Sequence, residues 1–171
     1  LDCGSNSHEV INYLKAKKIR SIIIDHHIIN NLKIPKSDIL INPTKNIQKL
    51  IKYNVCTATL TFFLVDLINK KLNSKFELDN YFIFSLISTI SDLMPLRGLN
   101  RKILIIGFKN LVIKNKGLKK LISKNLKKKL SYQDIGFNIG PLINSSGRIA
   151  KANDVVELFL TQDDERIDAI I

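Results

Sequence analysis

The alternation of apolar and polar positions predicts a helix and two short strands at the start of the chain. Apolar residues follow helix spacing over residues 7–17. The β-branched run Ile19–Ile24 then predicts a strand buried on both faces, and Asp38–Ile41 predicts a second strand that Asn42-Pro43 ends. Strands that alternate with helices favour a parallel sheet flanked by helices. The apolar positions of the first helix are Val10, Ile11 and Leu14.

The rest of the chain is mostly helical in its pattern. Helix spacing covers residues 57–72, 79–90, 100–112, 118–126 and 154–171. Ile135–Ile149 contains three glycines and one proline, which predicts a structured loop. The sequence therefore predicts the α/β class, with a partial parallel sheet flanked by helices, a mostly helical segment and the start of a linker helix. We expect one domain over residues 1–130 and a second part, with a Gly-Arg loop and the linker helix, over 131–171.

Composition separates the chain from disordered, disulfide-rich and membrane-spanning proteins. Hydrophobic residues make up 45% of the 171 residues, which is enough for a packed core. The apolar runs Ile19–Ile24 and Tyr81–Ile90 are too short or too polar for a bilayer, which requires about 20 residues. The two cysteines, Cys3 and Cys56, form no Cys-x-x-Cys pair and provide neither a disulfide framework nor a zinc signature. Reduced thiols are typical of the cytoplasm, where we expect the protein.

The charge balance favours a polyanionic partner. Lys and Arg number 27 against 15 Asp and Glu, which gives a net charge of +12. Most of the excess is lysine, beside abundant isoleucine and asparagine, and codon drift in an AT-rich genome would produce the same bias. Charge alone therefore leaves both interpretations open.

The sharpest pattern for chemistry is Asp25-His26-His27, at the carboxyl end of the first predicted strand. Ligands bind at this edge of open α/β sheets, and one carboxylate with two imidazoles suits a divalent metal of the manganese type. Neighbouring residues point in different directions, so we expect one to ligate metal and another to support it or contact the substrate. The alternative is that Asp25 caps a helix and the histidines lie at the surface.

Three weaker patterns accompany this one. Asp2-Cys3-Gly4 also follows a presumed strand, and its glycine would let the backbone approach a ligand closely. Asp92 closes an apolar helix, where a carboxylate is unfavourable for the helix dipole unless a cation compensates. The small-residue segment Asn144–Arg148 would hold a phosphate through backbone amides and a guanidinium. Each of the three is also typical of ordinary turns and loops.

In this order the segments resemble the motifs of the DHH phosphoesterase family. Asp2-Cys3-Gly4 is similar to its second motif, Asp25-His26-His27 to its third, and Asp92 within Ser91–Leu96 to its fourth. Further segments narrow the resemblance to the RecJ-type exonucleases, and it extends over nearly the whole chain. These segments are Cys56–Phe62, Gly98–Arg101, Ile135–Phe137 and Asn144–Arg148.

The resemblance implies an enzyme of DNA repair and recombination that hydrolyses single-stranded DNA in the 5′-to-3′ direction with two Mn²⁺ or Mg²⁺ ions. Asp2 would bridge both ions, and His26 and Asp92 would ligate one of them. Asp25 would support these ligands, and His27 would contact the scissile phosphate. The residues implied to bind the DNA are Arg101, Asn144, Gly147 and Arg148.

The chain also departs from the family pattern. The first motif, an Asp-x-Asp pair, is expected before Leu1, and no Asp-x-Asp occurs within the 171 residues. A second domain and a nucleic-acid-binding barrel are expected after Ile171. Other residues replace a family glycine or arginine at four positions, which are Thr59, Ser88, Leu142 and Ala150.

These departures lead us to expect an internal fragment. By itself it would bind metal weakly, leave an edge of its sheet exposed and not turn over DNA. Two other interpretations stay open at this point. One is a different DHH phosphodiesterase that acts on short oligonucleotides or cyclic dinucleotides, and the other is a gene remnant without enzymatic activity.

Overall fold

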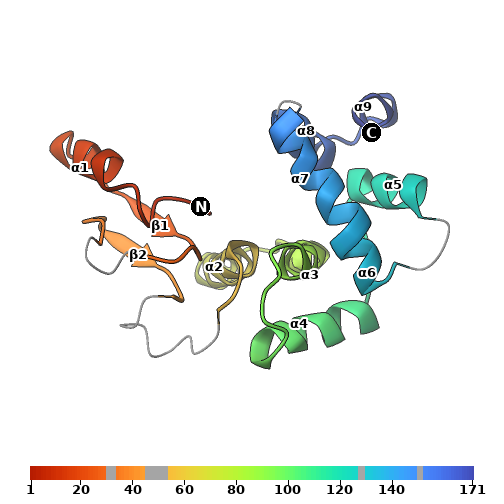
Figure 1. Cartoon of the computed structure of the whole chain (residues 1–171), viewed down its shortest axis with the longest axis horizontal. Helices are drawn as coiled ribbons and strands as arrows, with labels where there is room; N and C mark the ends of the chain where they lie inside the picture. Colours follow the sequence, from red (N-terminus) through yellow and green to blue (C-terminus); the bar gives the residue numbers. More distant parts are fainter. Residues whose placement is uncertain (30–33, 45–53, 127–129, 150–151) are drawn as a thin grey trace. The chain divides into compact units, whose positions relative to one another are not determined.

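The structure of the chain is a computed structural model (Figure 1). Contacts within the chain divide it into two compact units. The described residues are 1–29, 34–44, 54–126, 130–149 and 152–171. The first unit comprises Leu1–Phe76 and Met94–Lys102, and the second comprises Glu77–Leu93 and Ile103–Ile171. This division follows contacts within the chain, and the domain boundary after residue 130 stays a prediction.

A two-stranded parallel sheet is the centre of the first unit. The strand β1 is Ile22–Ile24 and the strand β2 is Ile39–Ile41, with Ile22 opposite Ile39. The arrows of both strands point the same way in Figure 1. The backbone N–H of Asp25 extends the ladder by donating to the carbonyl of Ile41 at 3.0 Å. The parallel sheet predicted from the two apolar runs is confirmed.

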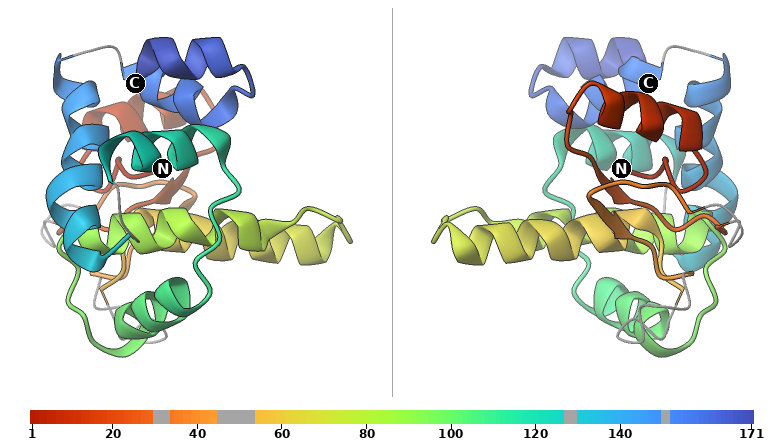
Figure 2. Two further views of the ribbon diagram at one scale, coloured as in Figure 1. Left: turned by 90° about the vertical axis from the view of Figure 1, so that its right-hand side faces the viewer. Right: turned by 90° about the vertical axis from the view of Figure 1, so that its left-hand side faces the viewer.

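Different segments cover the two faces of β1. The helix α1 is His8–Ala16, and the helix α2 is Thr57–Lys71, which is seen from the side in Figure 2. Ile23 packs against the loop before α1, because a Cβ added to Gly4 would lie only 3.3 Å from the Ile23 side chain. Ile24 points to the opposite face, as neighbours on a strand do. The residues packed around Ile24 there are Val55, Leu60, Ile41, Leu64 and Leu99.

The strand β1 is shorter than the apolar run that predicted it. Lys18 has a left-handed backbone at φ 58° directly after α1, and Ile19 in the turn that follows is 52% exposed. Ile22 is also exposed, whereas Ile23 and Ile24 are buried. Burial on both faces therefore applies only to the last two residues of the run.

The predicted apolar faces of α1 and α2 are only partly buried. In α1, Ile11 is buried but Val10 is exposed. In α2, Leu60 is buried whereas Phe63 and Leu67 are exposed. A helix of 15 residues is about 22 Å long, more than twice the length of a three-residue strand, so α2 extends beyond the sheet. No helix in the described part of the chain has both the length and the apolar character needed to cross a membrane.

The second unit is built around the helix α3. A 3₁₀ turn, η1, covers Leu78–Tyr81, and α3 continues from it over Phe82–Ser91. The apolar character of α3 fits its position, because most of its residues are buried. These residues are Ile83, Ser85, Leu86, Ile87, Thr89 and Ile90.

Four further helices follow the predicted helical segments. They are α4 (Gly98–Lys109), α5 (Lys116–Asn125), α8 (Ala152–Leu160) and α9 (Asp164–Ile170). The helix α4 begins in the first unit and ends in the second. The helices α5 and α8 pack very closely, because a Cβ added to Gly117 would overlap the carbonyl oxygen of Leu158. The single helix predicted over residues 154–171 is interrupted between α8 and α9.

The loop predicted over Ile135–Ile149 is wrong, because this segment is helical. Three elements follow one another, namely α6 (Tyr132–Asp134), the π-helix η2 (Ile135–Ile139) and α7 (Gly140–Ile149). A capping box between Ser131 and Asp134 starts this run. A Cβ added to Gly140 would overlap the Oγ of Ser91. This glycine therefore permits close packing of α7 on α3 and does not mark a turn.

Candidate metal centre

The carboxylate of Asp25 is buried directly after β1 and binds backbone amides. Asp25 is 1% exposed. Its Oδ2 accepts a hydrogen bond from the N–H of Ser5 at 3.0 Å, and its Oδ1 accepts one from the N–H of His26 at 2.8 Å. These bonds hold the loop around Ser5 against the end of β1. No helix begins within the described residues 25–29, so the alternative that Asp25 caps a helix is wrong.

Asp25 also orients the imidazole of His27. Its Oδ1 lies 2.7 Å from Nδ1 of His27. Burial raises the pKa of Asp25, but hydrogen bonds from His27 and Ser5 lower it by more, so the pKa of this carboxyl lies well below its usual range. An ionised carboxylate can only accept, so Nδ1 carries a proton and Nε2 of the neutral ring has a lone pair. A carboxylate behind an imidazole is the usual support of a metal-binding histidine.

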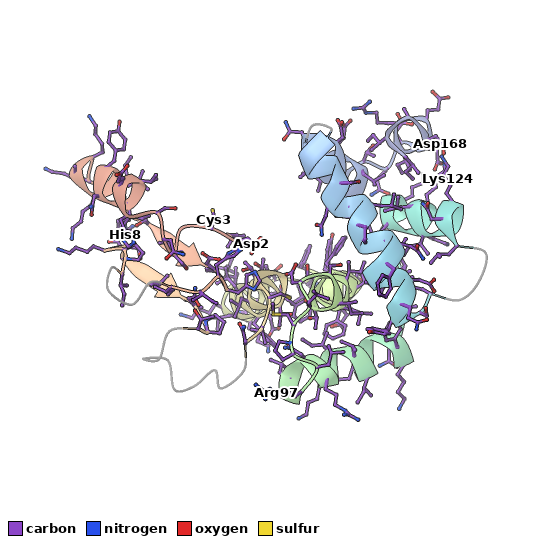
Figure 3. The ribbon with its side chains drawn as sticks, viewed as in Figure 1. Asp2, Cys3, His8, Arg97, Lys124 and Asp168 are labelled. Carbon is purple, nitrogen blue, oxygen red and sulfur yellow. The ribbon has the colours of Figure 1, made fainter. Side chains whose placement is uncertain are left out.

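Asp2 reaches the same edge of the sheet from the start of the chain. Its backbone N–H donates to the carbonyl of Ile24 at 2.9 Å. The backbone N–H and C=O of successive strand residues point to opposite sides, and those of Asp25 point toward β2. The backbone groups of Ile24 therefore point away from β2. Asp2, which bonds to the Ile24 carbonyl, lies on that other side of β1. The Oδ1 of Asp2 is 3.4 Å from Nε2 of His26. Figure 3 shows Asp2 and Cys3 beyond the carboxyl end of β1.

Three potential ligand atoms converge at this edge. One atom each of Asp2, His26 and His27 lies within 4.8 Å of the other two. The His26 side chain is 11% exposed, whereas those of Asp2 and His27 are 62% and 59% exposed, so the cluster is open to solvent on one side. A carboxylate oxygen with two imidazole nitrogens is a donor set that fits Mn²⁺ and related divalent cations. The structure brings together the four residues expected at this edge, and their individual roles stay predictions.

Asn42 supports the cluster, although the sequence indicated only a strand end at Asn42-Pro43. Asn42 follows β2 and is fully buried. Its Nδ2 donates to the Oγ of Ser5 at 2.8 Å and to the carbonyl of His27 at 2.9 Å. Its Oδ1 accepts from the N–H of Thr44 at 2.8 Å. The signal that points to Asn42 is its position, because the carboxyl ends of parallel strands meet at one edge.

Asp92 belongs to the second unit. It follows α3 as its C-cap residue, and its N–H donates to the carbonyl of Ser88 at 2.9 Å. Its side chain is exposed. The predicted end of an apolar helix at Asp92 is confirmed, and its participation in the metal centre stays a prediction.

The residues expected to bind DNA lie on two helices. Arg101 is exposed on the part of α4 that belongs to the first unit, and Asn144 is exposed on α7. The backbones of Gly147 and Arg148 also belong to α7, and the side chain of Arg148 lies outside the described residues. Backbone amides within a helix bond to carbonyls of the preceding turn. The segment is helical and not the loop that was expected, and its role in binding phosphate stays a prediction.

Comparison with known proteins agrees with the motifs at this edge. The sequence profile of the DHH family, N-terminal domain, matches residues 1–90. The single-stranded-DNA-specific exonuclease RecJ of Thermus thermophilus is 24% identical over 171 residues, which are 100% of this chain and 25% of the relative. RecJ of Haemophilus influenzae is 25% identical, over 95% of this chain and 30% of the relative. RecJ of Bacillus subtilis is 40% identical over 86 residues, which are 45% of this chain and 10% of the relative. The chain thus spans a minor part of the length of these relatives.

Solved structures share the fold. A crystal structure of RecJ in complex with Mn²⁺ from Thermus thermophilus has a TM-score of 0.86 at 24% identity and covers 99% of this chain and 26% of that one. A crystal structure of exonuclease RecJ bound to manganese has a TM-score of 0.85 at 24% identity and covers 99% of this chain and 43% of that one. The α/β architecture expected from the sequence is confirmed. The match over residues 1–90, which include Asp2 and Asp25-His26-His27, shows that the chain belongs to the DHH family.

Proposed function

We propose that the chain contributes part of the catalytic centre of a RecJ-type exonuclease. The complete enzyme would remove nucleotides from single-stranded DNA in the 5′-to-3′ direction by hydrolysing phosphodiesters with Mn²⁺ or Mg²⁺. The observation that carries this proposal is the convergence of Asp2, His26 and His27 within 4.8 Å, with Asp25 behind them. The relatives that cover nearly the whole chain are single-stranded-DNA-specific exonucleases, which supports the substrate class.

Each residue of the cluster has a role that follows from its contacts. Asp2 and His26 would hold a cation between the carboxylate and Nε2, which lie 3.4 Å apart. Asp92 would add a second carboxylate. Asp25 holds His27 through Nδ1, so that Nε2 of the neutral ring is a lone-pair donor that suits a cation, and contact with a phosphate oxygen would require a proton on Nε2. When bound, the two cations would polarise the phosphodiester and lower the pKa of an attacking water.

The number of donors suggests that further residues complete this centre. An octahedral cation takes about six ligands, so two cations need more donors than this cluster and Asp92 provide, even when ligands are shared. Water, substrate oxygens and residues outside the 171-residue stretch would fill the remaining positions. We therefore expect the chain by itself to bind Mn²⁺ weakly and not to hydrolyse DNA.

The remaining functional assignments belong to the complete enzyme. Arg101, Asn144, Gly147 and Arg148 would contact the DNA strand or its 5′ end. The enzyme would act in the cytoplasm, in DNA repair and recombination, with other repair proteins as partners. The net charge of +12 supports a polyanionic substrate.

Mn²⁺ binding to the 171-residue chain tests the metal centre directly. Titration followed by the electron paramagnetic resonance signal of free Mn²⁺ gives the dissociation constant for the wild type, Asp2→Asn and His26→Gln. We expect each variant to weaken binding by at least about tenfold. His8→Gln is the matched control, because His8 is the one remaining histidine and lies outside the cluster. Equal affinities for the wild type, Asp2→Asn and His26→Gln would show that the cluster is no metal site.

Hydrolysis of end-labelled single-stranded DNA in Mn²⁺ tests the reaction. We expect a chain extended at both ends from its own reading frame to release a 5′ label before a 3′ label, and the 171-residue chain to release neither. Degradation of short oligonucleotides or cyclic dinucleotides in preference to long strands would favour the other DHH phosphodiesterase. An extended chain without any activity would favour a remnant. DNA cleavage by the 171-residue chain that Asp25→Ala abolishes would contradict the need for further residues.

A further inference from the structure

A basic hollow lies at the amino ends of β1 and β2. Its volume is about 300 Å³, and Ser21 and Asp38, which directly precede the two strands, form part of its wall. Both arrows in Figure 1 point away from α1, so the amino ends of the strands lie on the side of α1. The other polar residues around the hollow are Lys15, Lys18, Arg20, Lys36 and Ser37.

Cations dominate the wall of this hollow. Lys15, Lys18, Arg20 and Lys36 contribute four positive charges, and Asp38 contributes one negative charge. The Asp38 carboxylate is already engaged, because its Oδ2 accepts the backbone N–H of Ser21 at 2.7 Å. Within the described residues, none of the four cations is in an ion pair with a carboxylate. The hollow therefore has a net positive charge that the described part of the chain does not neutralise.

The backbone before the hollow is held in an unfavourable conformation. Lys18 has φ 58°, a region that favours glycine, and it follows α1 in a Schellman turn. In this turn the N–H of Lys18 donates to the carbonyl of Lys15 at 2.9 Å, and the N–H of Ile19 donates to the carbonyl of Leu14 at 2.9 Å. A lysine at a position that suits glycine adds a cation to the hollow at the expense of backbone strain.

The hollow is separate from the candidate metal centre. Ser21 precedes β1, whereas Asp25 follows it, and four residues of extended chain span about 13 Å. The two sites thus lie at opposite ends of the same strand. From the cavity and its unpaired cations, we infer that this hollow binds a phosphate group of a single-stranded nucleic acid. The choice of a single-stranded nucleic acid rests on the proposed function, whereas the binding itself requires no hydrolysis.

Phosphate fits the hollow better than a carboxylate does. A phosphate group offers more oxygen acceptors to the Arg20 guanidinium and the lysine ammonium groups than a carboxylate, which has only two. A volume of about 300 Å³ accommodates a phosphate with part of its sugar, and it is small for a folded partner surface.

Binding of fluorescent oligothymidylate to the 171-residue chain in EDTA tests this inference without interference from a bound metal. The double variant Arg20→Gln/Lys36→Gln removes two charges from the hollow. The control Lys71→Gln/Lys75→Gln removes two exposed charges elsewhere in the same unit. We expect the hollow variant to bind about tenfold more weakly near 0.1 M salt and its slope of log K against log salt to fall by about 1.4. The control should keep both values near those of the wild type, and equal losses in the two variants would overturn the inference.

The variant Lys18→Gly separates loss of binding from loss of folding. Glycine suits φ 58°, so this variant should raise the melting temperature while it weakens oligothymidylate binding. Unchanged binding by a stabilised Lys18→Gly would contradict a role of Lys18 in the hollow.

Competing ligands distinguish the sources of the anion. Inorganic phosphate and thymidine monophosphate should compete with oligothymidylate and shift the NMR signals of the Ser21 and Ser37 amides. The signals should not shift in the Arg20→Gln/Lys36→Gln variant. If thymidine monophosphate binds the hollow and oligothymidylate does not, the ligand would be a free nucleotide and the inference would be overturned. Tighter binding of an oligoglutamate of equal charge would overturn it in favour of an acidic peptide.

Discussion

The side-chain amide of Asn42 donates a hydrogen bond of 2.9 Å to the backbone carbonyl of His27. The same amide donates to Ser5, whose N–H binds the carboxylate of Asp25. One buried residue at the end of β2 therefore connects both segments that carry the candidate ligands. The geometry of the cluster depends on β2 as well as on β1, although β2 supplies no ligand in the described structure.

Replacement of Asn42 by alanine should loosen the cluster. Asn42→Ala removes one of two donors from the His27 carbonyl, which Thr44 Oγ1 also reaches at 3.2 Å, and it leaves the buried Ser5 hydroxyl without this partner. An unpaired buried polar group costs about 1–3 kcal/mol. Residues that support ligands typically change metal affinity by about 10–100-fold. We expect both effects, measured as the free energy of unfolding in urea and as the Mn²⁺ dissociation constant.

Asn69→Ala is the matched control for Asn42. Asn69 lies on α2 and donates one hydrogen bond to the carbonyl of Phe76 at 3.0 Å, away from the cluster. It should leave Mn²⁺ affinity unchanged. An Asn42→Ala protein with wild-type Mn²⁺ affinity would show that the His27 carbonyl does not need this bond.

Acid should destabilise the fold through Asp25. Burial raises the pKa of Asp25, hydrogen bonds from His27 and Ser5 lower it by more, and the net pKa is well below the usual range. A carboxyl group with a depressed folded-state pKa stabilises the fold above its unfolded pKa of about 3.9, and this contribution disappears as the pH falls through the folded pKa. Asp25→Asn should therefore be less stable than the wild type at pH 7. The difference in unfolding free energy should shrink as the pH falls below about 4.

Urea unfolding at several pH values between about 2 and 7 measures this difference. Asp79→Asn provides the comparison, because it removes a carboxylate from an exposed position. A constant difference between the wild type and Asp25→Asn across the acid range would mean that ionised Asp25 does not stabilise the fold.

Gly140→Ala should destabilise the second unit. The new Cβ would overlap the Oγ of Ser91 and lie 2.9 Å from the carbonyl oxygen of Ile135, so α7 or its neighbours must shift. Overpacking of this kind costs about 1–3 kcal/mol. Gly136→Ala is the control, because its Cβ would meet only Ile90, at an ordinary 3.5 Å. It should be neutral or slightly stabilising, since alanine favours helix.

A double variant identifies the contact responsible. Ser91→Gly combined with Gly140→Ala removes the closer of the two clashes and should recover at least about 0.5 kcal/mol relative to the sum of the single variants. Thermal or urea unfolding gives the required free energies. Strict additivity would place the cost of Gly140→Ala at Ile135 and not at Ser91.

Asp168→Asn should weaken the contact between α5 and α9 in a salt-dependent manner. Asp168 lies 2.5 Å from Nζ of Lys120 and 3.0 Å from Nζ of Lys124, and hydrogen bonds from these lysines lower the pKa of Asp168. We expect a lower melting temperature in dilute buffer and a smaller difference at about 1 M salt, where the Debye length is about 3 Å. Glu165→Gln, an exposed change on the same helix, should show less salt dependence. A difference for Asp168→Asn that is independent of salt would contradict an electrostatic origin.

The sequence predicted the elements whose pattern reflects their own burial. The apolar run ending at Ile24 and the strand ending at Ile41 both lie in the sheet, because β-branched residues flanked by polar ones suit short buried strands. The residues after β1 were expected at a ligand-binding edge, and Asp25, His26 and His27 lie there with Asp2. Order along the chain was sufficient for these features.

Features that depend on partners distant in the sequence were not predictable in this way. The glycine at position 140 looks like a loop residue until the position of Ser91 is known. Asn42 looks like a strand end until its contacts with Ser5 and His27 are known. The left-handed conformation of Lys18 follows from hydrogen bonds of the turn and has no signal in the residue type. The tertiary structure is needed in each case, because the local conformational propensity of a residue carries no information about its distant contacts.

The interleaved composition of the two units has a consequence for biosynthesis. The first unit includes Met94–Lys102, so it is incomplete until the ribosome has translated Glu77–Leu93 of the second unit. The contacts of the first unit therefore cannot be complete before Glu77–Leu93 of the second has been made, in contrast to units that follow one another along a chain. While the residues of α3 are being translated, Leu99 has not yet been made, so the core around Ile24 lacks one of the side chains that pack against it. Protection of newly made chains by chaperones would matter most during this interval of translation.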